Sequence, residues 1–302
     1  MHILATEGLT KRFPTVTAVD QLTVTVGPGV TGLVGANGAG KSTLIKILLG
    51  LLPPTSGTAR VLDLDVTSQG AGIRRLVGYM PEHECLPPDV SATELVVHLA
   101  QMSGLPRTAA RERAADVLRH VGLAEERYRP IGGYSTGMKQ RVKLAQALVH
   151  DPKVVFLDEP TNGLDPRGRD EMLTLVRRIG TEFGISVVVT SHLLGELERI
   201  CDHVVVIDAG RLLRSSAIGE FTQTTRTVTV EVDEGMDALA ARLSEAGHTV
   251  SPQGRLLVVE VLGPETYDAV RDAAADLDLC LIRLEQGRHR IEDVFREEVA
   301  HV

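Results

Sequence analysis

One glycine-rich stretch constrains the fold of this chain more than any other. The stretch is Gly35-Ala36-Asn37-Gly38-Ala39-Gly40-Lys41-Ser42, and Thr43 follows it. It matches the pattern G-x-x-x-x-G-K-[ST]. A short apolar run, Val30 to Val34, precedes it and predicts a buried strand. An apolar helical repeat, Leu44 to Leu52, follows it. The stretch is therefore predicted to be a loop between a strand and a helix.

A loop of this kind can bind a phosphate group. Glycines let successive backbone N–H groups point at one anion, and the following helix adds the positive end of its dipole. We expect Lys41 to reach the β- and γ-phosphates of a nucleotide and Ser42 to offer its hydroxyl to Mg²⁺. A plain glycine-rich turn is the alternative, but Lys-Ser at the end of the loop favours phosphate binding.

A pair of carboxylates follows a second buried strand. Val154 to Leu157 is apolar and leads directly into Asp158-Glu159. One carboxylate can hold Mg²⁺, directly or through water, and the other can polarise a water molecule for in-line attack on the γ-phosphorus. We assign Asp158 to the metal and Glu159 to the water. An isolated Asp-Glu pair is usually surface charge, so this assignment depends on the strand and on Lys41.

The order of strands and helices predicts an α/β fold with a mostly parallel sheet. Polar motifs follow the expected strands at residues 30–34, 154–157 and 185–190. Ligands of such sheets bind beyond the carboxyl ends of the strands, so we expect these motifs to form one site. Two further segments, 3–13 and 16–26, predict an antiparallel β layer. Residues 83–150 predict a helical insertion.

A domain boundary is expected near residues 219–226. Residues 1–220 would form the nucleotide-binding domain. Residues 225–302 would form a small accessory domain, because their strands and helices follow the order βαββαβ of a ferredoxin-like α+β fold. A last helix is expected over residues 291–299.

Charge and composition limit the possible partners. The net charge of −8 argues against a general nucleic-acid binder, so no nucleic-acid partner is expected. No apolar run approaches the ~18 residues of a membrane-spanning helix, and Met1 to Thr10 lacks the apolar core of a signal peptide. We expect a soluble chain that needs a partner for any membrane role. The three cysteines lack metal-ligand spacing and are expected to be buried free thiols.

The most specific motif lies in the middle of the chain. The motif is Tyr134-Ser135-Thr136-Gly137-Met138-Lys139-Gln140-Arg141. It resembles the signature motif of ABC-type ATPases, in the variant found in drug and polysaccharide exporters. Ser135 and Gly137 stand at the expected start of a helix, so they can bind an anion. The alternative is that Ser135 only caps this helix. The resemblance covers residues 1 to about 220 and implies a P-loop ATPase core.

Other motifs of this family occur in the family's order. By resemblance, Asp165 is the D-loop aspartate, and His192 is the switch histidine that contacts the γ-phosphate and positions Glu159. Phe13 matches the aromatic residue that stacks on adenine, although it could instead pack in the core. Glu82 stands at the family's Q-loop position, where a Gln usually contacts Mg²⁺ and water; by resemblance Glu82 would make these contacts with more negative charge. Because an ionised Glu adds charge and cannot donate a hydrogen bond, we expect slower or pH-shifted hydrolysis relative to Glu82→Gln.

The resemblance also implies ligands and partners. ATP and Mg²⁺ would bind at the glycine loop. A second ATPase subunit would complete a head-to-tail dimer in which Ser135, Thr136, Gly137 and Met138 contact the ATP of the other chain. A separately encoded transmembrane permease would contact the helical insertion and hold the protein at the cytoplasmic face of the membrane.

The end of the chain gives a weaker indication of the transported compound. Residues 289–295 resemble the Leu-Glu-Asp-Val-Phe ending of antibiotic- and drug-export ATPases, although an ordinary amphipathic helix would look similar. We therefore expect the ATPase subunit of a drug or antibiotic exporter. The alternatives are a non-transport ABC ATPase that acts on nucleic acid or ribosomes, and a nucleotide-dependent sequestering protein. The single phosphate loop, the lack of sustained heptads and the acidic charge disfavour the nucleic-acid alternative.

Overall fold

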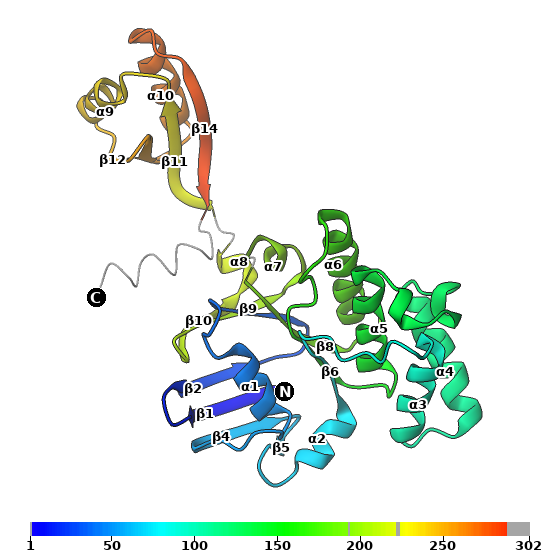
Figure 1. Ribbon diagram of the computed structural model, residues 1–302. Helices are drawn as coiled ribbons and strands as arrows, with labels where there is room; N and C mark the ends of the chain where they lie inside the picture. The colour runs from blue at the N-terminus through cyan, green and yellow to red at the C-terminus, as the bar shows by residue number, and fades with distance from the viewer. Residues whose placement is uncertain (1, 193, 222–223, 289–302) are drawn as a thin grey trace. The chain divides into compact units, whose positions relative to one another are not determined.

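The chain forms two compact units. The structure, a computed structural model, describes residues 2–192, 194–221 and 224–288. The first unit spans Met1–Ile218 and the second begins at Gly219 (Figure 1). The helix expected over residues 291–299 and the motif at residues 289–295 lie outside the described residues.

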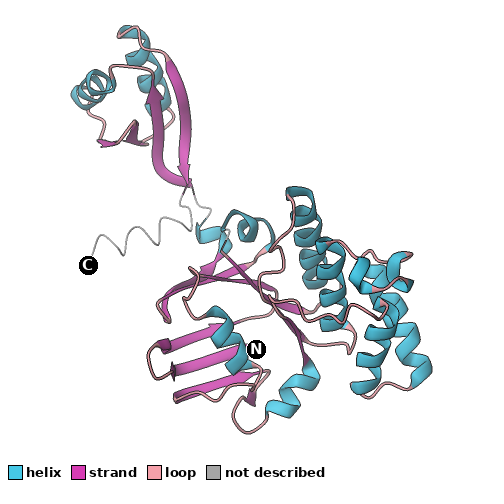
Figure 2. Ribbon diagram, viewed as in Figure 1, coloured by secondary structure: helices cyan, strands magenta, loops and turns pink. Residues whose placement is uncertain are grey.

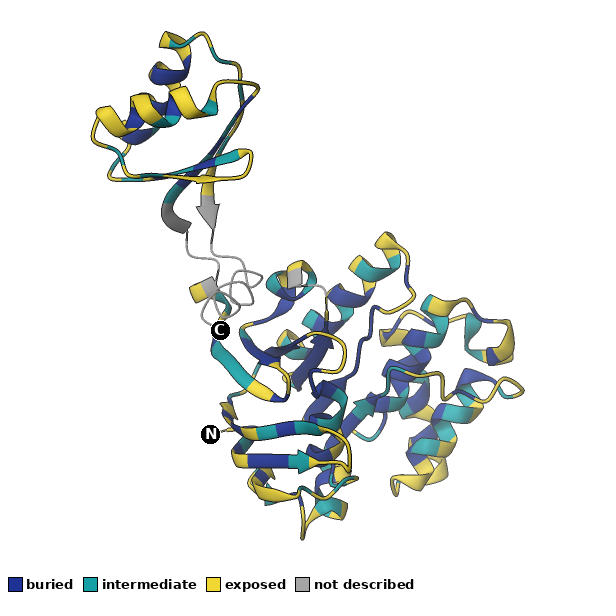
Figure 3. Cartoon of the chain, turned by 60° about the vertical axis from the view of Figure 1, so that its left-hand side comes forward, coloured by how far each residue is buried: buried dark blue, intermediate teal, exposed yellow. Residues whose placement is uncertain are grey.

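The first unit is built on a mostly parallel sheet, which confirms the predicted fold class. Within the described residues its strand order is β10-β9-β3-β8-β7-β6. The strands are β3 (Val30–Val34), β6 (Val77–Met80), β7 (Val154–Leu157), β8 (Ser186–Ser191), β9 (His203–Asp208) and β10 (Arg211–Ala217). Among these six described strands, only β10 pairs antiparallel with its neighbour. Every residue of β3, β7 and β8 is buried, and the middle of the sheet is dark blue in Figure 3. Burial on both faces explains why these strands are apolar runs.

An antiparallel sheet forms a second layer, as expected. Its order is β2-β1-β4-β5, and its strands are β1 (Leu4–Arg12), β2 (Thr17–Val26), β4 (Ser56–Val61) and β5 (Leu64–Asp65). Helix α1 (Lys41–Leu48) buries Leu44, Ile45 and Ile47 in a core cluster that contains residues of both sheets. The glycine loop is thereby fixed between a buried strand and a buried helix.

Helices α3 (Ala92–Met102), α4 (Arg107–His120) and α5 (Thr136–Leu148) pack on one another. Short 3-10 turns at Glu126–Tyr128 and Ile131–Gly133 connect α4 to α5. Figure 2 shows these helices and the antiparallel strands on different sides of the first unit. Helix α5 also packs against β6. A Cβ at Gly78 would lie 2.0 Å from the carbonyl oxygen of Ala147, so this close contact requires glycine.

The second unit has the expected βαββαβ order. Its elements are β11 (Thr224–Val232), α9 (Met236–Glu245), β12 (Val250–Gln253), β13 (Leu256–Glu260), α10 (Glu265–Asp276) and β14 (Leu281–Arg288). The strands pair antiparallel in the order β12-β13-β11-β14. Val228, Val230 and Val259 are buried in one cluster with Leu239 of α9 and Val270 of α10. Alternating apolar residues in the strands therefore meet one face of each helix.

Some expectations require correction. Helix α2 (Gly70–Leu76) was not predicted, because it is short and contains two glycines. The prediction of buried thiols is wrong for Cys85 and Cys280, which are exposed at loops, and right for Cys201. Over the described part of the chain, no helix is long and apolar enough to cross a bilayer.

Candidate active site

The glycine loop has the backbone that its sequence predicts. Gly40 has φ 103°, and a Cβ there would lie 2.1 Å from the carbonyl oxygen of Ala18, so only glycine fits. Helix α1 begins at the next residue, Lys41. The Lys41 ammonium is 7% exposed and donates to the carbonyl oxygens of Gly35 (2.7 Å) and Ala36 (3.1 Å). Its charge is thus satisfied within the loop, close to where a phosphate would bind.

The loop opens onto a cavity of about 320 Å³, called here the nucleotide cavity. It is lined by Ala18, Asn37, Gly38, Gly40, Lys41, Ser42, Thr43, Glu82, Asp158 and Glu159. The fold therefore brings the loop, the acidic pair and Glu82 to one place at the carboxyl ends of β3, β6 and β7. This meeting point is the one expected for a parallel sheet.

The cavity contains a set of oxygen atoms suited to Mg²⁺. The Ser42 hydroxyl donates to Asp158 Oδ1 at 3.3 Å, and the Glu82 carboxylate lines the same space. Mg²⁺ in nucleotide sites usually takes one or two carboxylates and fills its other positions with water and phosphate oxygens. Among the described residues, no group of three or more His, Cys, Asp or Glu side chains could hold a metal by itself. Ser42, Asp158 and Glu82 thus fit an ion that arrives with a nucleotide.

A hydroxyl from the neighbouring strand fixes both carboxylate residues. Thr190 of β8 is 0% exposed, and its hydroxyl donates to Asp158 Oδ1 at 2.9 Å while accepting the backbone N–H of Glu159 at 2.8 Å. Glu159 has φ 49°, a conformation that is costly for a non-glycine residue. Thr190 therefore holds a strained backbone in place. Sequence reasoning used Thr190 only as the end of a strand and missed this role, which depends on the pairing of β7 with β8.

Further contacts hold Asp158 and the segment around Glu82. Burial and the neighbouring Asp158 carboxylate raise the pKa of Tyr79, so its hydroxyl remains a donor to Asp158. Lys143 of α5 donates to the backbone carbonyl of Glu82 at 2.8 Å, and burial lowers the pKa of this lysine. Asn162 Nδ2 donates to Glu82 Oε1 at 3.3 Å. The carboxylate oxygen of Glu82 thus accepts from an amide donor, as the amide oxygen of a Gln also could.

The Glu159 side chain is buried between two basic groups. Its Oε2 lies 2.9 Å from His192 Nδ1, and its Oε1 lies 4.0 Å from Lys41 Nζ. This Oε1 is buried and has no hydrogen-bond partner within the described residues. A buried carboxylate oxygen is normally paired, so it suits an additional donor such as a water molecule. Because Glu159 lines the nucleotide cavity, that water would lie beside a bound phosphate.

Phe13 lies apart from this group. It is in the loop between β1 and β2, its side chain is 39% exposed, and Lys11 Nζ lies 5.4 Å from its ring centroid. It therefore does not pack in the core. Phe13 is not among the described residues that line the nucleotide cavity. Its exposed aromatic ring can still receive a stacked base.

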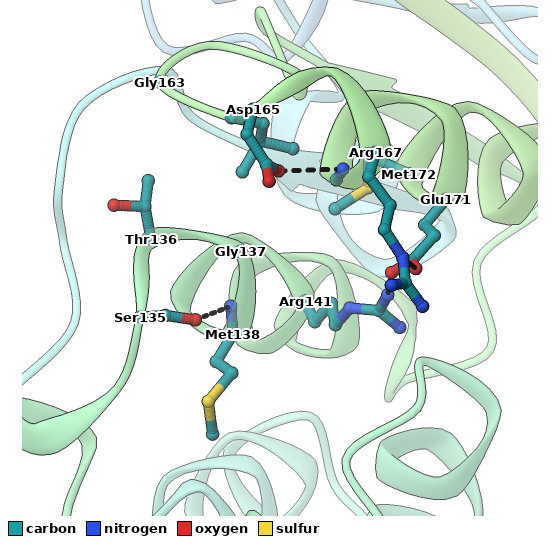
Figure 4. A pocket seen from close by; sticks show the side chains of 12 residues that line it. Ser135, Thr136, Gly137, Met138, Arg141, Gly163, Asp165, Arg167, Glu171 and Met172 are labelled. Atoms are coloured by element: carbon teal, nitrogen blue, oxygen red, sulfur yellow. Dashed lines mark hydrogen bonds and ion pairs between the residues drawn. The ribbon is translucent and has the colours of Figure 1, made fainter.

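The signature residues line a cavity of their own, of about 570 Å³, called here the signature cavity. Its lining is Ser135, Thr136, Gly137, Met138, Arg141, Gly163, Leu164, Asp165, Arg167, Gly168, Glu171 and Met172. Helices α5 and α6 (Pro166–Thr181) both begin here. Ser135 accepts the N–H of Met138 at 3.3 Å, and Asp165 accepts the N–H of Gly168 at 2.9 Å. Ser135 therefore caps its helix and also faces open space (Figure 4).

The charges of the signature cavity are partly paired. Arg141 from α5 and Arg167 from α6 both point toward Glu171 and form ion pairs with it at 2.7 and 3.0 Å (Figure 4). Two positive helix ends and two arginines face one glutamate and one aspartate, so this region can receive an anion. No lining residue of the signature cavity occurs in the described lining of the nucleotide cavity.

Comparison with known proteins points to a single family. The family model described as "ABC transporter" matches residues 19–162. An ABC transporter ATP-binding protein of Bacillus subtilis, YxlF, is 34% identical, with 98% of this chain and 99% of that protein covered. The daunorubicin/doxorubicin resistance ATP-binding protein DrrA of Streptomyces peucetius is 36% identical, with 85% of this chain and 75% of that protein covered. The structure of CbiO1 from Clostridium perfringens, part of an ABC transporter complex, matches with a TM-score of 0.67 and 29% identity over 82% of this chain and 97% of that chain.

Proposed function

The chain belongs to the ATP-binding proteins of ABC transporters, and from this membership we propose that it hydrolyses MgATP to drive a separately encoded permease that exports a drug or antibiotic. ATP hydrolysis is the activity of this ATPase family.

One observation supports the hydrolytic role above all others. Glu159 Oε1 is buried in the cavity that also contains Lys41, Ser42 and Asp158, and it has no hydrogen-bond partner among the described residues. A general base needs to be within hydrogen-bond reach of the water that it activates, and Glu159 Oε1 is free to accept such a bond. His192 at Oε2 holds the carboxylate in a single orientation.

The remaining residues bind and orient the nucleotide. The backbone N–H groups of the loop and the start of α1 face the phosphates, and Lys41 exchanges its carbonyl partners for phosphate oxygens. Ser42, Asp158 and Glu82 would hold Mg²⁺, which neutralises charge on the β- and γ-phosphates. Phe13 supplies a stacking surface for adenine. Asp165 fixes the start of α6 beside the signature cavity.

The signature cavity supports a dimer. Its anion-facing groups lie outside the nucleotide cavity of the same chain, so a second copy is needed to bring Ser135–Met138 to a bound triphosphate. In such a head-to-tail dimer each ATP contacts both chains. ATP binding would close the dimer, and hydrolysis would let it open.

The named relatives support export over the other functions. A resistance ATP-binding protein for daunorubicin and doxorubicin aligns with most of this chain, and its name indicates a role in drug resistance. This similarity favours a drug or antibiotic exporter over an ATPase that acts on nucleic acid or a sequestering protein. The protein would then bind to the cytoplasmic face of the membrane through its permease, with the second unit in an accessory role.

The hydrolytic part of the proposal is tested with Glu159→Gln. We expect this variant to bind MgATP, to lose at least about 100-fold in kcat, and to accumulate as an ATP-bound dimer on size exclusion. Glu182→Gln, which removes an exposed carboxylate at the end of α6, is the matched control and should hydrolyse ATP normally. Near-normal turnover of Glu159→Gln would overturn the assignment of the general base.

The transport part is tested with membranes. The chain is co-expressed with a candidate permease, which is a neighbouring reading frame with about six membrane spans, and ATP-dependent loss of daunorubicin from the cells is measured. We expect efflux with the wild type and none with Glu159→Gln. A chain that hydrolyses ATP but neither binds to permease-containing membranes nor supports efflux would contradict the export proposal.

A further inference from the structure

One carboxylate outside the nucleotide cavity joins two of the segments that carry catalytic groups. Glu196 lies on α7 (Leu194–Ile200), four residues after His192. Its Oε2 accepts hydrogen bonds from the Thr161 hydroxyl at 2.8 Å and from the Ser191 hydroxyl at 3.4 Å. Hydrogen bonds to an ionised carboxylate are among the stronger ones in proteins.

The two hydroxyls belong to segments that lie far apart in the sequence. Thr161 comes two residues after Glu159, and Ser191 directly precedes His192. Both hydroxyl-bearing residues are buried, at 4% and 2% exposure. One carboxylate oxygen therefore holds the segment of the general base and the segment of the histidine at a fixed separation.

We propose that Glu196 is a positioning residue for ATP hydrolysis, which keeps His192 within hydrogen-bond distance of Glu159. The pair that it supports is separated by only 2.9 Å, and a small shift of either segment would break it. Glu196 does not occur among the described residues that line the nucleotide cavity, so its effect is indirect. This inference rests on the proposed ATPase function.

The position of α7 explains why a carboxylate works at this place. Leu197 and Ile200 are buried and fix the helix against the sheet, which leaves Glu196 facing the hydroxyls. Both hydroxyls donate to one oxygen atom, so the amide oxygen of a glutamine at position 196 could still accept these hydrogen bonds, but more weakly than a carboxylate. Alanine could accept neither. The expected order of turnover is therefore wild type, then Glu196→Gln, then Glu196→Ala.

The test measures steady-state ATPase activity of the full chain over a range of MgATP concentrations. For Glu196→Ala we expect kcat to fall about 10-fold and KM to change less than about 2-fold, because the nucleotide contacts remain. For Glu196→Gln we expect about a 3-fold loss of kcat. Glu198→Ala removes a carboxylate from the same helix and is the matched control, with unchanged kcat. Rates are divided by the fraction of protein that binds a fluorescent ATP analogue, so unfolded protein does not count.

A double variant of the two donors distinguishes a positioning role of Glu196 from a general loss of stability. Thr161→Val with Ser191→Ala removes both donors and should itself lower kcat about 10-fold. If Glu196 acts through these hydroxyls, adding Glu196→Ala to this background has no further effect on kcat. A fully additive loss, or a normal kcat for Glu196→Ala alone, would overturn the inference. A wild-type chain that binds MgATP without hydrolysing it would instead refute the proposed function, and with it this inference.

Discussion

Thr190→Val should disturb the positions of Asp158 and Glu159 while it leaves both carboxylates in place. Valine has nearly the shape of threonine but cannot accept the Glu159 N–H or donate to Asp158 Oδ1. An unpaired buried N–H costs about 1–3 kcal/mol, and a lost hydrogen bond to a charged group costs about 1.5–3 kcal/mol. Because such terms are not strictly additive, we expect a loss of about 3–5 kcal/mol in the free energy of unfolding of the first unit.

This loss should be visible in heat denaturation and in turnover. For a unit of this size each kcal/mol corresponds to about 2–4 °C, so the Tm of the first unit should fall by roughly 6–20 °C. Without the hydroxyl, the strained backbone at Glu159 is free to relax, and a shift of about 1 Å can cost about 100-fold in rate. We expect kcat to fall about 10- to 100-fold, with a nearly unchanged KM for ATP.

Thr190→Ser is the matched control, because it keeps the hydroxyl and removes one methyl group. It should cost about 1 kcal/mol and retain most of the turnover. The assay is differential scanning calorimetry of both variants, together with ATPase rates measured well below either transition. If the Val and Ser variants agree within about 1 kcal/mol in stability and twofold in kcat, the hydroxyl does not hold Glu159 as described.

Other testable changes affect the glycine loop, position 82 and the cysteine thiols. Gly40→Ala should abolish MgATP binding measured by isothermal titration calorimetry, because its Cβ would lie 2.1 Å from a carbonyl oxygen; tight binding would contradict the loop argument. Glu82→Gln keeps an acceptor for Asn162 and removes a charge, so turnover should rise or its pH profile should shift; identical rates from pH 6 to 9 would dismiss this idea. Burial raises the pKa of Cys201 to about 12, so iodoacetamide at pH 8 should modify exposed Cys280 in the native protein and Cys201 only after unfolding, as intact mass would show.

Local sequence patterns predicted most of the architecture. The apolar runs before Gly35 and Asp158 identified buried strands, because strands covered on both faces contain few polar residues. An aspartate followed by a proline is typical of a helix start, and Asp165, which precedes Pro166, is the N-cap of α6. Helix α2 escaped prediction because its seven residues bury only Ile73.

The contacts around the acidic pair could not be predicted from the sequence alone. Thr190 was expected only as the end of a strand, and nothing in the local sequence around Thr190 or Glu196 indicated a role. Their partners lie 31 to 35 positions away, at Asp158, Glu159 and Thr161. Such contacts depend on which strands are neighbours and in which register they pair.

The sequence by itself determined the motifs from which ATP hydrolysis is proposed, because the glycine loop, the acidic pair and the signature motif are each defined by local residue types and spacing. Tertiary structure decided how those groups are held. The register of β7 against β8 places the Thr190 hydroxyl between Asp158 and Glu159, and α7 places Glu196 between Thr161 and Ser191. A hydrogen bond depends on tenths of an ångström between atoms, and only the packed sheet fixes distances of that size.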